Sequence, residues 1–343
     1  MIFGRDIGID LGTTSVLIST RGKGVILREP AVVAIDRNTG RLLNVGMAAQ
    51  RMLGRTPGNI VAIRPMSNGA ISDYDMTERM LKEFTRKALS FSLLKPRIII
   101  SVPSGITEVE ERAVIDAGVA AGARKVYLME APLAAAIGAG LDVTKPDGHM
   151  VIDIGGGTTD VAVLSLSGVV QSVSIKAGGE AFDEALIKFI KRKHDVIIGE
   201  TTAEELKKGI GCVFPRPDSV SVEVKGRCLH TGLPKVVAVH TNDVLEAFEH
   251  VTEKIVEAVH NILENTPPEL VADISQNGIV LTGGNCLLWG FDKLISSRTS
   301  IATHVADDAD MCVANGLSKA LNWVGDMSEG TINLARRRQM AQV

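Results

Sequence analysis

The sequence lacks an excess of positive charge. Its 37 lysines and arginines are outnumbered by 40 aspartates and glutamates, which gives a formal net charge of −3. Nucleic-acid binding depends on positive charge that neutralises phosphates. We therefore expect no nucleic-acid partner.

Cysteine is also scarce. The four cysteines lie far apart and form no Cys-x-x-Cys pair, which argues against a zinc site or a disulfide framework. This usage fits a reducing cytoplasm. The cysteines are Cys212, Cys228, Cys286 and Cys312.

Long apolar runs are missing as well. No run reaches the roughly 20 apolar residues that a membrane-spanning helix needs. The strand-like segment at residues 6–10 begins too early to leave room for a signal peptide. We expect a cytoplasmic protein that is soluble or at most peripheral on a membrane.

The chain contains an internal duplication. Alternating apolar residues at 7–11 are followed by a glycine-threonine turn and a second apolar run at 16–18, which predicts strand, turn and strand. The same pattern returns at residues 151–160 and 161–164. No low-complexity linker separates the halves, so we expect them to pack together around a shared cleft, where ligands commonly bind.

Helix and strand signals alternate between the two copies. Asp75 with Glu78, and Thr107 with Glu110, have the spacing of capping boxes at helix starts, and residues 98–100 read as a strand. This alternation predicts an α/β layered fold.

Further elements follow from composition and period. The alanine-rich residues 134–140 suit a helix packed closely on its neighbours, and a helix is expected around 182–189. Residues 219–224 and 236–239 alternate like a hairpin, whereas 245–262 has the apolar spacing of a long helix.

The two glycine-threonine turns are the main candidates for chemistry. Backbone N–H groups and hydroxyls in such a turn can cradle phosphate oxygens, and one turn from each half can grip a polyphosphate from opposite walls of a cleft. The alternative is that these glycines only make hairpin turns. Asp10 and Asp153 precede the two turns and are suitable oxygen ligands for Mg²⁺, reached through its bound waters.

Two later segments suit a nucleoside. Residues 278–285 read as a strand and a glycine turn that can admit a flat base. Glu204 and Lys207 lie three apart at a helix start, where both can hydrogen-bond a ribose or a base edge. Taken alone, they are better interpreted as an ordinary solvated ion pair.

Along the chain, the four elements are the turn at residues 12–15, the turn at 155–158, the pair Glu204 and Lys207, and the segment at 278–285. In this order they resemble the nucleotide site shared by actin, DnaK-type chaperones and sugar kinases. Within that superfamily the chain is similar to the MreB family over nearly its whole length, through RMLGRTPGNI (51–60), VPSGIT (102–107), residues 134–141 and the Asp153 motif. The resemblance implies a duplicated actin-like, ribonuclease H-like α/β fold with two lobes around a nucleotide cleft.

The resemblance also implies subdomain boundaries. The first lobe has a large subdomain at residues 1–32, 66–144 and 322–343 and a small one at 33–65. The second lobe has a large subdomain at 145–177 and 243–321 and a small one at 178–242.

The resemblance assigns residues to ATP and Mg²⁺. Asn285 stands where the family usually has a third glycine, so the fit at the base differs there. Asp10 and Asp153 take the metal. The nucleotide residues are Gly12, Thr13, Thr14 and Ser15 in the first phosphate loop, Gly155, Gly156, Gly157 and Thr158 in the second, Glu204, Glu205, Leu206 and Lys207 at the sugar, and Gly283, Gly284, Asn285 and Cys286 at the base.

A second departure concerns hydrolysis. The family usually reads Glu-Glu-Pro where this chain reads Glu130-Ala131-Pro132, and the residue before the proline helps to position the attacking water. Because phosphoryl transfer to water gains mainly from positioning and electrostatics, Ala131 predicts weak hydrolysis. Asp153 and Thr158 remain as catalytic candidates, with Glu130 as a substitute that points differently.

The segment at residues 90–95 places Phe91, Leu93 and Leu94 in a short connection, although connections are normally polar. These side chains either pack on their own domain or, as the family resemblance implies, insert into the inner membrane.

The resemblance therefore implies an ATP-dependent filament protein on the inner face of the cytoplasmic membrane that organises cell-wall synthesis and rod shape. Its implied partners are other copies of itself, membrane lipid, a membrane adaptor and cell-wall elongation proteins. The alternative is a small-molecule kinase or regulatory ATPase of the same superfamily, although no segment matches a kinase acceptor site.

Overall fold

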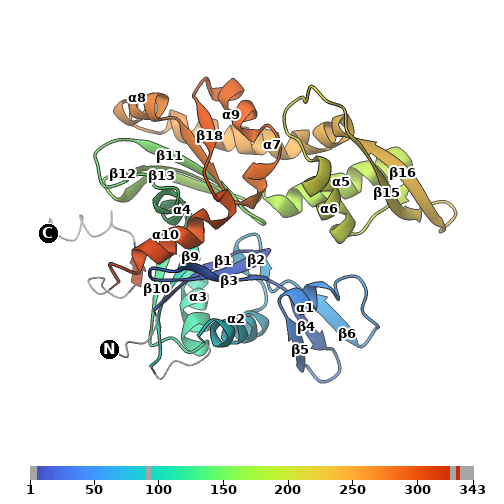
Figure 1. Cartoon of the computed structure of the whole chain (residues 1–343), viewed down its shortest axis with the longest axis horizontal. Coiled ribbons are helices and arrows are strands. Elements are labelled where there is room, and N and C mark those ends of the chain that lie inside the picture. The colour runs from blue at the N-terminus through green and yellow to red at the C-terminus, as the bar shows by residue number, and fades with distance from the viewer. Residues whose placement is uncertain (1–5, 90–93, 325–329, 333–343) are drawn as a thin grey trace.

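The computed structural model of the chain describes residues 6–89, 94–324 and 330–332. Two lobes lie one above the other in Figure 1, and each contains a mixed sheet with helices packed against it. The predicted α/β layering is therefore confirmed.

The first lobe is built on a sheet with the strand order β19-β10-β9-β1-β2-β3. β1 and β2 form the predicted antiparallel pair, and β1 runs parallel to β9. Helices α2 and α3 pack against this sheet. The elements are β1 (Ile7–Leu11), β2 (Ser15–Thr20), β3 (Gly24–Pro30), β7 (Met66–Ser67), β8 (Ala70–Ile71), α2 (Tyr74–Leu89), β9 (Arg97–Val102), α3 (Glu108–Ala120), β10 (Lys125–Glu130) and β19 (Gly330–Ile332).

The second lobe repeats this arrangement with the order β13-β12-β11-β17-β18. β11 is antiparallel to β12 and parallel to β17, as β1 is to β2 and β9. The duplication predicted from the sequence is thus a duplication of structure. The elements are β11 (His149–Ile154), β12 (Thr159–Ser165), β13 (Gly168–Ile175), α7 (Thr241–Glu264), α8 (Pro268–Asn277), β17 (Ile279–Thr282), η1 (Gly284–Leu287), α9 (Phe291–Thr299), β18 (Thr303–Val305) and η2 (Ala309–Met311).

The central strands are mostly apolar because both faces of each sheet are covered, although β1 carries Asp10 and β11 carries Asp153. In β9, Ile98 and Ile100 pack into a core with α2 and α3, whereas Ile99 faces a different core. In β11, Ile152 packs toward α5 (Gly179–His194) and α7, whereas Val151 joins the same core as Ile99. This shared core joins the inner faces of the two lobes.

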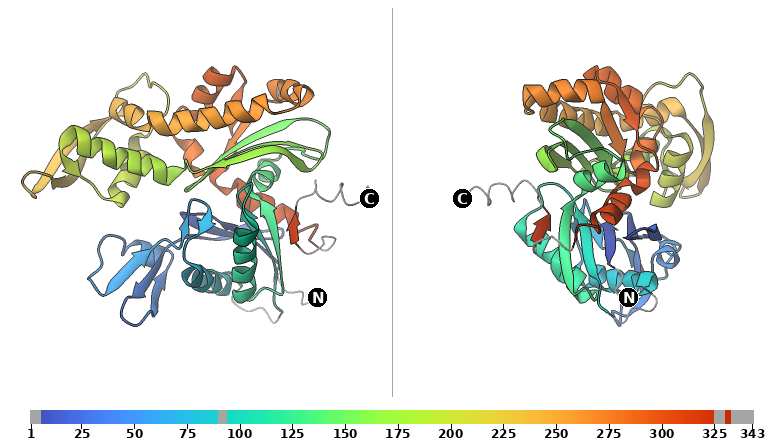
Figure 2. Two further views of the ribbon diagram at one scale, coloured as in Figure 1. Left: turned by 180° about the vertical axis from the view of Figure 1, so that it is seen from behind. Right: turned by 60° about the vertical axis from the view of Figure 1, so that its left-hand side comes forward.

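Two helices pass between the lobes, α4 (Ala131–Gly138) and α10 (Cys312–Ala320). They lie between the sheets in both views of Figure 2 and contact each other closely. A Cβ on Gly138 would overlap the carbonyl oxygen of Cys312, and one on Gly316 would overlap that of Ala134. The predicted close packing of the alanine-rich helix therefore depends on glycine at the crossing.

A small unit extends from each lobe to the same side of the molecule (Figure 1). The unit of the first lobe has the strand order β5-β4-β6, and that of the second has β14-β15-β16, which includes the predicted hairpin. The elements are β4 (Val33–Asp36), β5 (Leu42–Val45), α1 (Met47–Gln50) and β6 (Ile60–Ile63), then α5 (Gly179–His194), β14 (Val196–Ile197), α6 (Glu200–Ile210), β15 (Ser221–Cys228) and β16 (Pro234–His240).

One of the two predicted capping boxes is correct. Thr107 and Glu110 form a capping box at the start of α3. The box at Asp75 is wrong, because α2 already begins at Tyr74 and the side chain of Asp73 accepts the hydrogen bond from the backbone N–H of Met76, at 3.1 Å. An aspartate two residues earlier therefore occupies the capping position.

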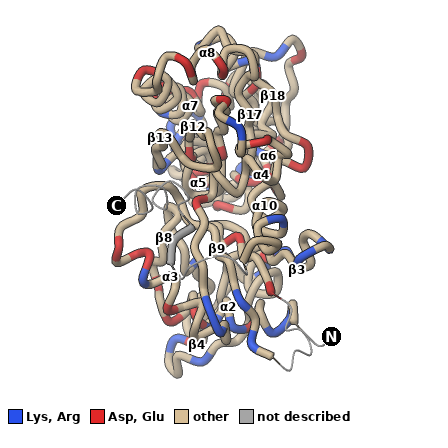
Figure 3. Tube along the Cα trace, turned by 90° about the vertical axis from the view of Figure 1, so that its left-hand side faces the viewer, with Lys and Arg blue, Asp and Glu red and all other residues tan. Residues whose placement is uncertain are grey.

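Charged residues of both signs are spread over both lobes (Figure 3). All four cysteines are buried free thiols. Within the described residues, no helix is both long and apolar enough to cross a bilayer.

Candidate functional site

A cleft of about 700 Å³ lies between the lobes. Most of the residues that the sequence analysis proposed for a ligand line it, although they come from distant parts of the chain. These are Asp10, Gly12, Thr13, Thr14, Ser15, Asp153, Gly155, Gly156, Gly157, Thr158, Glu204, Lys207, Gly283, Gly284 and Asn285.

Four proposed residues do not line the cleft. Glu205 is exposed, and Leu206 and Cys286 are buried in the core of the second lobe. Glu130 accepts a hydrogen bond from the hydroxyl of Ser104, at 2.9 Å, while its neighbour Ala131 faces the cleft. On α6, the helical period turns successive side chains to different sides, so only part of the stretch can face a ligand.

The two glycine turns are each closed by the same backbone hydrogen bond, and both line the cleft. The N–H of Gly12 donates to the carbonyl of Ser15 at 3.1 Å, and that of Gly155 donates to Thr158 at 2.9 Å. A Cβ on Gly156 would overlap the side chain of Thr14. The glycines therefore make hairpin turns and also allow the lobes to approach.

Two carboxylates lie beneath these turns, Asp153 buried and Asp10 partly buried. The hydroxyl of Ser101 donates to Asp10 at 2.8 Å, and that of Thr282 donates to Asp153 at 3.1 Å. Burial raises the pKa of Asp10 to about 6. Burial, followed by the charges of Asp160 and Asp10, raises the pKa of Asp153 to about 7. Because two neighbouring carboxylates disfavour each other's negative charge, a divalent cation between them would relieve the repulsion.

Asp160 lines the cleft but was missed in the sequence analysis. One of its carboxylate oxygens accepts from the hydroxyl of Thr158 at 2.9 Å, and the other accepts from the backbone N–H of Ser104 at 3.2 Å. Burial raises the pKa of Asp160. This carboxylate fixes the rotamer of Thr158 and joins the lobes. Its position at the end of the duplicated motif was the available signal.

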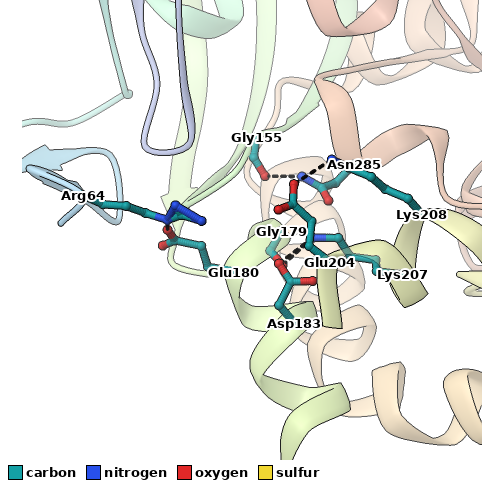
Figure 4. Close-up of polar contacts among 9 residues, drawn as sticks. All are labelled: Arg64, Gly155, Gly179, Glu180, Asp183, Glu204, Lys207, Lys208 and Asn285. Carbon is teal, nitrogen blue, oxygen red and sulfur yellow. Dashed lines mark hydrogen bonds and ion pairs between the residues drawn. The ribbon is translucent and has the colours of Figure 1, made fainter. Parts of the chain in front are cut away.

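The segment that was predicted to bind the sugar does not form the simple Glu204–Lys207 pair that the sequence suggested. Lys207 is buried, and its ammonium donates to the carbonyl of Gly179 and to Asp183, both at 2.9 Å. Glu204 instead pairs with Lys208 at 2.7 Å. Figure 4 shows the carboxylates of Glu204 and Asp183 close to Lys207. Lys207 therefore holds the wall of the cleft, and Glu204 remains at its surface.

Two contacts in this region were not predicted. Arg64, from the small unit of the first lobe, pairs with Glu180 on α5 of the second, at 3.4 Å. The side-chain amide of Asn285 donates to the carbonyl of Gly155 at 2.9 Å (Figure 4). The sequence carried no signal for the first, whereas Asn285 was visible as a departure from the family pattern.

Comparison with known proteins agrees with this architecture. A family model described as MreB/Mbl protein matches residues 4–329. The cell shape-determining protein Mbl of Bacillus cereus is 49% identical, over 92% of this chain and 95% of its own. The cell shape-determining protein MreB of Escherichia coli is 47% identical, over 96% and 97%.

Solved structures show the same fold. MreB5 of Spiroplasma citri bound to AMPPNP superposes with a TM-score of 0.89 at 35% identity, covering 94% of this chain and 97% of that one. The MamK double helical filament matches with a TM-score of 0.80 at 20% identity, over 93% and 98%. The two-lobed duplicated fold is thus that of the actin-like proteins. Within that class, the chain belongs to the MreB/Mbl family.

Proposed function

We propose that this chain is an ATP-dependent, filament-forming protein that determines cell shape from the inner face of the cytoplasmic membrane. The observation that carries the proposal is the meeting of two glycine turns, one from each lobe and each closed by the same backbone hydrogen bond, above the carboxylates of Asp10 and Asp153. The naming of relatives as cell shape-determining proteins supports it, as do structures of MreB5 bound to AMPPNP and to ADP.

The cleft offers a place for each part of ATP. Backbone N–H groups and hydroxyls of residues 12–15 and 155–158 would hold the polyphosphate. Glu204 would accept a hydrogen bond from the ribose, and Gly283 and Gly284, which also line the cleft, would leave room for the base. Asp10 and Asp153 would hold Mg²⁺ through its waters, and the ion when bound neutralises phosphate charge.

Hydrolysis is proposed to be weak because the methyl group of Ala131 faces the cleft where a carboxylate would orient water. Thr158 can still orient water, since Asp160 accepts its proton and leaves its lone pairs free. Ala131→Glu is therefore expected to speed phosphate release at saturating ATP. A variant no faster than the native chain would remove this part of the proposal.

ATP is proposed to act mainly as a switch for assembly. Nucleotide that contacts both lobes favours the closed cleft, and closure favours head-to-tail association into an open filament. Sedimentation of the purified chain with Mg-ATP and with EDTA tests this, with electron microscopy of the pellet. A chain that binds ATP but stays in the supernatant would favour a kinase or regulatory ATPase.

Membrane contact is proposed through the apolar connection at residues 90–95. Phe91 and Leu93 lie outside the described residues, and Leu94 is 53% exposed. Pelleting with anionic liposomes tests the contact by comparing the native chain with Phe91→Ser combined with Leu93→Ser and Leu94→Ser. Binding that survives in the triple variant would exclude this segment as the anchor.

On the membrane, such filaments are proposed to recruit a membrane adaptor and cell-wall elongation proteins, and thereby to organise wall synthesis in a rod-shaped cell. The family resemblance and the names of the relatives support this role. Expression of the triple serine variant in place of the native chain should produce round cells. Rod-shaped cells would contradict a role that depends on the membrane.

A further inference from the structure

Asn285 occupies the corner where three segments of the second lobe meet. It lies in η1, after the glycine turn that follows β17, and its side chain reaches the first residue of the glycine turn between β11 and β12 (Figure 4). The carbonyl of Gly155 accepts from the Asn285 amide at 2.9 Å and from the backbone N–H of Gly179, the first residue of α5, at 3.0 Å. One carbonyl therefore connects the phosphate side and the base side of the cleft.

The corner is shaped around this amide. A Cβ on Gly179 would lie 2.6 Å from the amide nitrogen of Asn285 and 2.7 Å from its oxygen, so only glycine leaves room for the side chain. Gly283 approaches the backbone of Ile154 and has a φ of 84°, which again favours glycine. The side chain is thus packed in place and does not hang freely into the cleft.

The chemistry of the contact requires a donor at position 285. A backbone carbonyl can only accept, and the amide nitrogen is the donor end of the asparagine side chain. A glycine, which the family pattern leads us to expect here, provides no such bond. An aspartate has the same shape but would set a carboxylate against the Gly155 carbonyl and near the phosphates.

We propose that Asn285 is a positioning residue that ties the base loop (residues 283–285) to the second phosphate loop (residues 155–158) and so slows nucleotide release. This inference rests on the proposed function. A cleft wall that is held before binding loses less conformational freedom when the nucleotide enters. Residues 283–285 and 155–158 then act as one wall, and contact with the base supports contact with the phosphates.

The test is the release rate of a fluorescent ADP from the full chain, measured by stopped flow for the native protein, Asn285→Gly and Asn285→Asp. The glycine variant should release ADP about fivefold faster, because it loses the free energy of about one net hydrogen bond. The aspartate variant should release it at least about tenfold faster, because it adds repulsion at an unchanged shape.

Asn265→Asp is the matched control. The amide of Asn265 also donates to a backbone carbonyl, that of Asn261 at 2.8 Å, but at the exposed end of α7. The Asn265→Asp variant should release ADP at the native rate. Each nucleotide-free variant should melt in one cooperative transition, as a folded protein does.

The outcomes distinguish the role of Asn285 from the proposed function. An aspartate variant that releases ADP at the native rate would show that the side chain only fills space, and a glycine variant no faster than native would also overturn the inference. Failure of the native chain to bind ADP would remove the proposed function itself, and the inference with it.

Discussion

The charge of Asp153 is expected to destabilise the nucleotide-free protein. Asp153 is only 7% exposed at the end of β11, and burial together with Asp160 and Asp10 raises its pKa to about 7. Asp153→Asn keeps the shape and can still accept from Thr282, but it removes the charge. The variant should therefore be more stable than the native chain, while it loses the negative charge that is proposed to hold Mg²⁺.

The size of the gain depends on pH. A pKa raised from 3.8 to about 7 corresponds to about 4 kcal/mol, at about 1.4 kcal/mol per pKa unit. The folded state holds the proton that the unfolded chain releases, so the native chain loses this stability as pH rises from about 4 to about 7. The advantage of Asp153→Asn should be about 4 kcal/mol at pH 8 and below about 2 kcal/mol at pH 5.

Thermal melting in EDTA without nucleotide measures this gain. At about 2.1 cal/mol/K of unfolding entropy per residue, 4 kcal/mol corresponds to a Tm increase of about 5 °C at pH 8 for a chain of 343 residues. Asp147→Asn, at an exposed site, removes the same charge and should leave the Tm unchanged. If Asp153→Asn melts no higher than this control at pH 8, the reasoning is wrong.

Two further perturbations test the walls of the cleft. Gly157→Ala should weaken ADP binding by at least about tenfold, because the new methyl group meets Thr13 and the backbone of Asn68. Gly199→Ala, which meets nothing within 4 Å, should bind like the native chain, and equal affinity of the two variants would contradict this account. Lys207→Met should lower the free energy of unfolding in urea by about 3 kcal/mol, because it leaves the partly buried Asp183 without its cation. Lys208→Met breaks a pair whose lysine is largely exposed and should cost less than about 1 kcal/mol, so similar losses would argue against a buried pair.

Local patterns were enough to predict most elements and the duplication. Strand alternation at residues 7–11 and 151–154 and the capping box of Thr107 depend on neighbours in sequence, and the structure contains all of them. The error at Asp75 arose between two nearby aspartates that both satisfy the rule for a helix start. Local rules place an element well but its first residue less well.

The order of residues along the chain was enough to predict two glycine turns, each preceded by an aspartate, in a duplicated α/β fold, and to reveal the departures at Ala131 and Asn285. The contacts of these residues became visible only in the folded molecule. It paired Lys207 with Asp183, joined Arg64 to Glu180 across the lobes, turned Glu130 toward Ser104 and set Asn285 against Gly155. These contacts depend on how helices and loops far apart in the chain pack in three dimensions, and the spacing of residues along the sequence carries no record of that packing.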